Sequence, residues 1–290
     1  MLTAVGIALL SAACYAVSAV LQQHQASRHA DTSGALVLKL ARQPLWWSAV
    51  VATLAGAGLH VAALAFGPLW VVEPPGVTTL VFALAFGVLF SRRAVSRGEW
   101  VAAGAVMVGV ATVVAAAPDQ GRPVHLTLGA LGWQVAQAAA VVLILTVLAR
   151  FLGRRSGAVI RAAAAATCFG TAAAMARVGL SGAGSFTVTA LVAVVSAAVG
   201  FTLAQTAYRD GGLGAPLATL ILVDPLAGIG SGLALLGAPV ALDPLQVVLA
   251  TLGLLVTSAG ICVLAGVRAP RWPRPRHSPP ASTGELNRLR

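Results

Sequence analysis

The sequence predicts an all-α polytopic membrane protein with nine transmembrane helices. Three observations support this fold class: hydrophobic residues make up 58% of the chain, charged residues only 9%, and the mean hydropathy is +0.89. A soluble domain carries about 25% charged residues. This chain cannot cover a water-facing surface with polar groups, so we expect its apolar side chains to face lipid.

Apolar runs define the predicted spans. A bilayer core about 30 Å thick requires roughly 20 helical residues to cross it. Runs of this length lie at 2–22, 44–66, 68–91, 99–117, 127–149, 158–180, 186–208, 213–236 and 244–267. The first run has no Lys or Arg before it, which predicts a retained span and not a signal peptide. The basic, proline-rich segment 268–290 predicts a disordered cytoplasmic tail.

The basic residues indicate the orientation of these spans. With the N-terminus outside and the C-terminus in the cytoplasm, only Arg122 and Arg177 lie outside, and the other seventeen Lys and Arg residues lie inside. Such a bias is typical of membrane proteins. The net charge of +11 is therefore explained by basic residues on the cytoplasmic side of the membrane, and we expect no nucleic-acid partner. Heavy use of Ala, Gly and Arg favours a GC-rich bacterium, and hence its plasma membrane.

An internal repeat relates two parts of the chain. Residues 12–19 of the first span are similar to residues 166–173 of the sixth, and Val72-Glu73-Pro74 of the third matches Val223-Asp224-Pro225 of the eighth. Both matches pair span n with span n+5, which places two four-helix units in opposite orientations. We expect a first repeat at 1–117, an extra fifth span with its loops at 118–157, and a second repeat at 158–267. Inverted repeats hold substrate at their interface near the membrane midplane.

Three segments resemble a known family. Pro44-Leu45-Trp46-Trp47, Ala65-Phe66-Gly67-Pro68-Leu69 and Val71-Val72-Glu73-Pro74 resemble the drug/metabolite transporter superfamily, and are most similar to its EamA-like and NIPA-like branches. The resemblance covers spans one to four best and implies inverted four-helix repeats. The chain differs from the NIPA-like pattern at Gly58-Leu59-His60, where that pattern has Gly-Glu, and at the basic Ser91-Arg92-Arg93.

Two acidic residues beside prolines are the first candidate binding residues. Ionisable groups inside a membrane are costly and often functional. Glu73 precedes Pro74, Pro75 and Gly76, which predict a helix break, so Glu73 is interpreted either as a cap at that break or as a proton or cation site. Asp224 precedes Pro225, a second predicted break, near the middle of its span. We hypothesise proton coupling at Asp224, which uptake by Asp224→Asn over a pH series tests.

Polar residues within other spans are further candidates. One is His60, in the second span. Two are Gln134 and Gln137, which lie on one face of the fifth span, and two are the similarly spaced Thr202 and Gln205 of the seventh. His60 is either a hydrogen-bonded packing residue or a ligand. Each of the other pairs either joins two helices or lines a cavity. Gln22, Gln23 and His24 end the first span, where we expect them to be solvated at the cytoplasmic boundary.

These patterns predict a function in transport. The sequence contains no P-loop, HExxH or dinucleotide fingerprint, so we expect no enzyme activity, no cofactor and no bound metal. The sequence and its resemblance to the drug/metabolite transporter superfamily together predict a secondary transporter that moves a small solute or metabolite by alternating access. The alternatives are a NIPA-like magnesium or divalent cation transporter and a non-transporting scaffold or accessory protein. We expect a monomer whose partners are the solute, a proton or cation, and the lipid bilayer.

Overall fold

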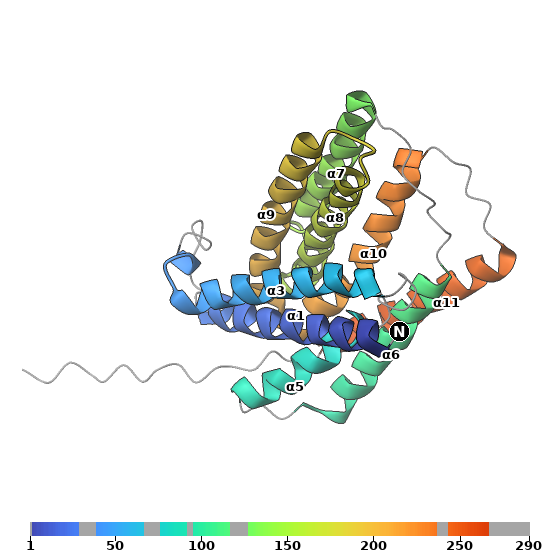
Figure 1. Ribbon diagram of the computed structural model, residues 1–290. Coiled ribbons are helices and arrows are strands. Elements are labelled where there is room, and N and C mark those ends of the chain that lie inside the picture. The colour runs from blue at the N-terminus through green and yellow to red at the C-terminus, as the bar shows by residue number, and fades with distance from the viewer. Residues whose placement is uncertain are drawn as a thin grey trace, which may run out of the picture.

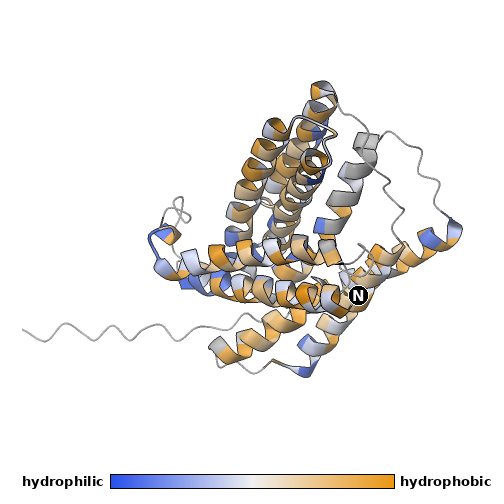
Figure 2. Ribbon diagram, viewed as in Figure 1, coloured by the Kyte–Doolittle hydropathy of each residue, from blue (hydrophilic) through white to orange (hydrophobic). Residues whose placement is uncertain are grey.

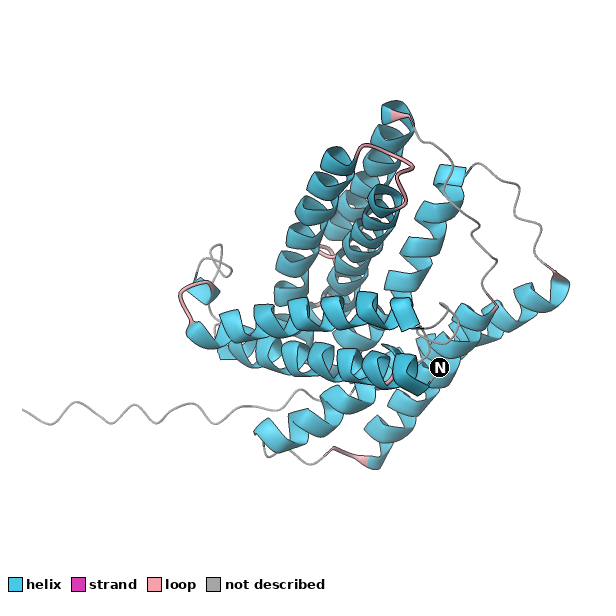
Figure 3. Cartoon of the chain, in the orientation of Figure 1, coloured by secondary structure: helices cyan, strands magenta, loops and turns pink. Residues whose placement is uncertain are grey.

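The fold is all-helical over the residues that the computed structural model describes, which are 2–28, 39–66, 76–91, 95–116, 127–236 and 243–266. No strand occurs within these ranges (Figure 3). The helices are α1 (Leu2–Arg28), α3 (Pro44–Phe66), α5 (Thr79–Ser91), α6 (Arg97–Ala115), α7 (Leu128–Leu148), α8 (Arg154–Leu180), α9 (Phe186–Gly211), α10 (Gly214–Leu236) and α11 (Pro244–Gly266). Each predicted span overlaps one of these helices, which confirms the all-α class. The predicted tail at 268–290 lies outside the described residues.

Six of the described helices are long and apolar enough to cross a membrane. They are α1, α6, α7, α8, α9 and α11. Hydrophilic residues gather near the helix ends, and the long central stretches are hydrophobic (Figure 2). Many large apolar side chains point away from the protein; Leu143 and Ile144 of α7, for example, are each 64% exposed. Apolar surface on this scale fits a lipid environment.

Local sequence explains where two of these helices begin. Ser96 and Glu99 form a capping box at the start of α6, in which the Ser96 hydroxyl accepts from the Glu99 amide at 3.2 Å and a Glu99 carboxylate oxygen accepts from the Ser96 amide at 2.9 Å. Thr127 caps α7 by accepting from the Ala130 amide. Glu99 is therefore a buried acidic residue with a structural role.

Glycines allow helix backbones to approach closely. On α6, a Cβ added to Gly109 would collide with the Thr257 hydroxyl and the Gly253 carbonyl of α11. On α11, a Cβ at Gly253 would lie 2.6 Å from the Gly109 carbonyl oxygen, and one at Gly260 would lie 2.9 Å from the Ala102 carbonyl oxygen. Helices in lipid associate through such close contacts because burial of apolar surface provides little driving force there.

The same device joins two more helix pairs. Gly200 of α9 faces the Ala165 carbonyl oxygen of α8, which a Cβ would approach to 2.9 Å. Gly56 of α3 faces the ring of Tyr15 on α1. Gly182, at φ 72°, makes the turn between α8 and α9 in a conformation that L side chains rarely adopt.

Some helix contacts correspond between the two predicted repeat units. The first two helices of each unit pack together, α1 with α3 and α8 with α9, and so do the first and third, α1 with α5 and α8 with α10. The fourth helices, α6 and α11, pack against each other between the units. The extra helix α7 packs mainly on α8. These pairings match between the predicted units, whereas the contacts of α9 with α1 and of α10 with α6 have no counterpart among the larger contacts between the described helices.

The direction of the α1–α3 pair differs from our expectation. The axes of helices that all span one bilayer lie roughly along the bilayer normal. In Figure 1 the antiparallel α1–α3 pair instead lies across the direction of α7, α8 and α9. The number of described helices that meet the length and hydropathy requirements is six, so the predicted count of nine spans is not established by this arrangement.

We expect Gly253→Ala to destabilise the protein by about 1–3 kcal/mol, because the new methyl group overpacks the α6–α11 contact. The matched control is Gly104→Ala on α6, where an added Cβ meets nothing within 4 Å. Thermal unfolding of both purified variants in detergent measures the difference. Equal midpoints would show that the close α6–α11 approach is absent from the protein in solution.

Candidate functional site

A buried polar cluster joins α1, α3 and α9. We define it by four residues, Ser18 and Gln22 of α1, Thr53 of α3 and Gln205 of α9. Gln205 is 0% exposed and Gln22 is 6% exposed. The cluster therefore lies inside the protein although it consists of hydrogen-bonding side chains.

One hydrogen bond links the two predicted repeat units through this cluster. The Gln205 amide nitrogen Nε2 donates to the Gln22 amide oxygen Oε1 at 2.7 Å, across 183 residues of sequence. Because α1 belongs to the first predicted unit and α9 to the second, a movement of one unit relative to the other either breaks this bond or requires α1 and α9 to move together. The Gln22–Gln205 bond is thus placed where the two units meet.

The remaining bonds orient Gln22. Its amide nitrogen donates to the Ser18 hydroxyl at 2.8 Å and lies 3.4 Å from the Thr53 hydroxyl. Ser18 donates to the Ala49 carbonyl of α3 at 2.7 Å, and the Ser18 and Thr53 hydroxyl oxygens are 2.6 Å apart. These contacts fix the Gln22 amide so that its oxygen faces Gln205.

The cluster retains unused hydrogen-bonding capacity. The buried Gln205 oxygen Oε1 has no hydrogen-bond partner among the described residues. An unpaired acceptor away from water is unfavourable, and most buried polar groups in proteins are paired. A hydroxyl, amide or ammonium group of a solute is the kind of donor that can satisfy this oxygen.

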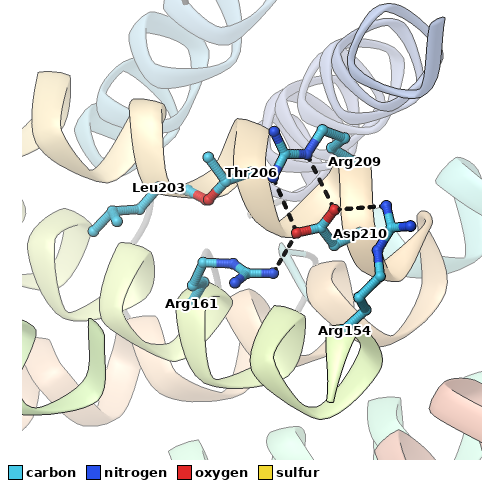
Figure 4. A network of polar contacts seen from close by, with 6 residues as sticks. All are labelled: Arg154, Arg161, Leu203, Thr206, Arg209 and Asp210. Carbon is cyan, nitrogen blue, oxygen red and sulfur yellow. Dashed lines mark hydrogen bonds and ion pairs between the residues drawn. The ribbon is translucent and has the colours of Figure 1, made fainter. Parts of the chain in front are cut away.

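A second polar cluster lies where α8 begins and α9 ends (Figure 4). The Asp210 carboxylate accepts from Arg154 at 3.2 Å, from Arg161 at 2.6 Å and from the adjacent Arg209 at 3.0 Å. The Asp210 side chain is only 7% exposed. We call this group the arginine–aspartate cluster. It ties the start of α8 to the end of α9 at the predicted cytoplasmic side.

The structure describes one of the two acidic candidates, Asp224. Glu73, Pro74 and Pro75 lie outside the described residues, and Gly76 precedes α5. Asp224 is half-buried on α10. The interruption predicted at Pro225 is wrong, because α10 runs continuously from Gly214 to Leu236. Transmembrane helices tolerate proline because neighbouring groups can satisfy the freed backbone carbonyl.

The glutamines of α7 differ in exposure: Gln134 is buried whereas Gln137 is exposed. The Thr202 hydroxyl donates to the Val199 carbonyl of its own helix at 2.7 Å. His60 is half-buried on α3. Of the candidate pairs, only Gln205 contributes to a polar cluster between helices.

Sequence reasoning misplaced Gln22 and missed Asp210. We expected solvation at the membrane boundary for Gln22, but α1 continues from the predicted end at 22 to Arg28, and Gln22 is buried against α9. Ser18 and Thr53 carry no signal of their own, because single hydroxyl residues commonly bond their own helix. Asp210 had one usable signal: it is an acidic residue directly after Arg209, at the end of a predicted apolar span.

No metal centre occurs in the described part of the chain, since no group of three or more His, Cys, Asp and Glu side chains there could hold a metal ion.

These features define a multi-pass helical membrane protein with a buried polar cluster between its helices. Comparisons with protein-family models, with curated proteins and with solved structures give no match to this chain.

We expect Gln205→Leu to destabilise the protein by about 1 kcal/mol, because it removes an interhelical hydrogen bond and leaves the Gln22 oxygen unpaired. The double variant Gln22→Leu/Gln205→Leu should recover part of this loss, since the cluster then has no buried amide without its partner. Gln137→Leu, at an exposed glutamine, is the control. Thermal unfolding in detergent measures all three, and a double variant less stable than Gln205→Leu would contradict the paired arrangement.

Proposed function

We propose that this protein is a secondary transporter that moves a small polar solute across the plasma membrane by alternating access. The observation that carries the proposal is the Gln205–Gln22 hydrogen bond, which joins the two predicted repeat units inside an apolar bundle. In transporters with inverted repeats, the substrate site lies between the units. The resemblance of the first four spans to the drug/metabolite transporter superfamily supports the same function.

The chemistry of the polar cluster favours a solute with hydrogen-bond donors. The cluster contains two amides and two hydroxyls and no charged side chain. The unpaired Gln205 oxygen is an acceptor. A solute that carries amine, amide or hydroxyl groups matches this arrangement. Proton coupling through Asp224 belongs to the proposal as a further hypothesis.

The proposal includes nine spans in two inverted repeats. The strong inside bias of Lys and Arg supports the count, and the matching helix pairs α1–α3 with α8–α9 and α1–α5 with α8–α10 support the repeats. Nine spans require the α1–α3 pair to align with α7–α9 in the bilayer, unlike the arrangement in Figure 1.

A topology experiment tests this count directly. If α1 and α3 both span, a tag at the N-terminus is accessible from outside intact cells, and a tag inserted between α1 and α3 is accessible only after the cells are opened. Tag-specific antibody labelling of cells and of opened cells distinguishes the two sides. Both tags on the same side would show that α1 does not cross the membrane and would rule out nine spans.

The transport prediction starts from a binding screen. We expect at least one compound from a panel of amines, amino acids, nucleosides and divalent cations to raise the thermal midpoint of the purified protein, because a ligand of the native state stabilises it. The compound that does so is then supplied in radiolabelled form to proteoliposomes. Uptake above that of empty liposomes is the expected result.

Variants separate a transport role of the cluster from a structural one. The Gln22→Leu/Gln205→Leu protein should remain folded but lose solute uptake, whereas Gln137→Leu should retain it. Full uptake by the double variant would show that the polar cluster is not part of the transport pathway. Stabilisation and uptake of magnesium alone would favour the divalent cation alternative, and no stabilisation by any compound would favour a non-transporting protein.

A further inference from the structure

Two arginines of α8 are held side by side by one carboxylate. Arg154 and Arg161 are seven residues apart, about two helical turns, so they lie on the same side of α8. One Nη2 donates to each Asp210 oxygen, at 3.2 Å from Arg154 and at 2.6 Å from Arg161. Figure 4 shows Asp210 between the two guanidinium groups. The carboxylate thus fixes two cationic groups close to each other.

The positive charge of this pair exceeds the negative charge that faces it. Asp210 can balance one of the two guanidinium groups, and it also bonds Arg209. Among the described residues, no other carboxylate forms an ion pair with Arg154 or Arg161. At least one positive charge therefore remains available to an external anion.

The pair also retains hydrogen-bond donors. A guanidinium group has five N–H donors. The Arg154 side chain is 72% exposed and uses one nitrogen for Asp210. The Nε of Arg161 is buried and has no partner among the described residues. Planar forks of N–H donors match the oxygens of phosphate and carboxylate groups in a bidentate geometry.

The predicted orientation places this pair at the inner leaflet. The same end of α8 carries Arg155, which donates to the Gly266 carbonyl at the end of α11 at 3.5 Å, and Arg150 precedes it in the loop from α7. The inner leaflet of a plasma membrane contains anionic phospholipids, and basic pockets between helices on that side bind their headgroups.

We propose that Arg154 and Arg161, positioned by Asp210, form a binding site for a phosphate group at the cytoplasmic end of α8. The headgroup of an anionic phospholipid and soluble inorganic phosphate share this chemistry. The site lies outside the buried polar cluster, and it does not depend on the transport function.

The test uses the full-length protein in a neutral detergent. Native mass spectrometry counts bound molecules during titration with short-chain phosphatidylglycerol, with short-chain phosphatidylcholine and with inorganic phosphate. We expect phosphatidylglycerol to bind more tightly than phosphatidylcholine, and Arg154→Gln to weaken its binding about fivefold. Arg154 is mostly exposed, so this variant should fold normally, which its thermal midpoint without ligand verifies.

Arg177→Gln is the matched control, because it removes the same charge from the opposite, exposed end of α8. Arg161→Gln is a second variant of the site and should also weaken binding. If inorganic phosphate displaces phosphatidylglycerol, the site binds a soluble phosphate ligand. If phosphatidylglycerol stays bound in the presence of phosphate, the ligand of the site is a lipid. Equal losses in Arg154→Gln and Arg177→Gln, or equal binding of the two lipids, would overturn the proposal.

Discussion

Close approach of helix backbones at small residues is the constraint on which this structure depends. Lipid is as apolar as the side chains that face it, so the helices gain little by burying apolar surface against each other. The pairs α6–α11 and α8–α9 instead bring a glycine of one helix against a carbonyl of the other, at Gly253 and Gly200. The buried face of α8 is largely alanine and glycine for the same reason. Such interfaces leave no space for large polar groups. The buried glutamines therefore mark places where the helices are packed in a different way.

The polar cluster satisfies a second requirement of a lipid environment. A polar group that cannot reach water has to bond within the protein. Gln22 meets this requirement through Ser18 and Gln205, and Gln205 does so only in part, because its oxygen has no partner among the described residues. The bond therefore both joins α1 to α9 and leaves an acceptor for a donor from outside the protein. This combination is the physical basis of the proposed solute site.

Helix α9 carries residues of both polar clusters. Gln205 faces α1, and Asp210, five residues further along, bonds the arginines at the start of α8. The two clusters differ in chemistry: one is uncharged and buried, whereas the other is cationic and partly open at a helix end. The first suits a polar solute inside the protein, and the second suits an anion at the membrane surface.

The sequence by itself determined the class of this protein and the positions of its helices. Mean hydropathy and apolar runs depend only on composition and order along the chain, so each predicted span overlaps a helix, although α5 covers only Thr79–Ser91 of the span predicted at 68–91. It also selected Gln205, a polar residue within an apolar run. Only the tertiary structure decided that Gln22 is its partner, that Pro225 lies in a continuous helix, that Gln134 and Gln137 face different surroundings, and that Asp210 holds Arg154 and Arg161. The physical reason is that such contacts join residues far apart in the chain, and their partners depend on how each helix is rotated and crossed against its neighbours.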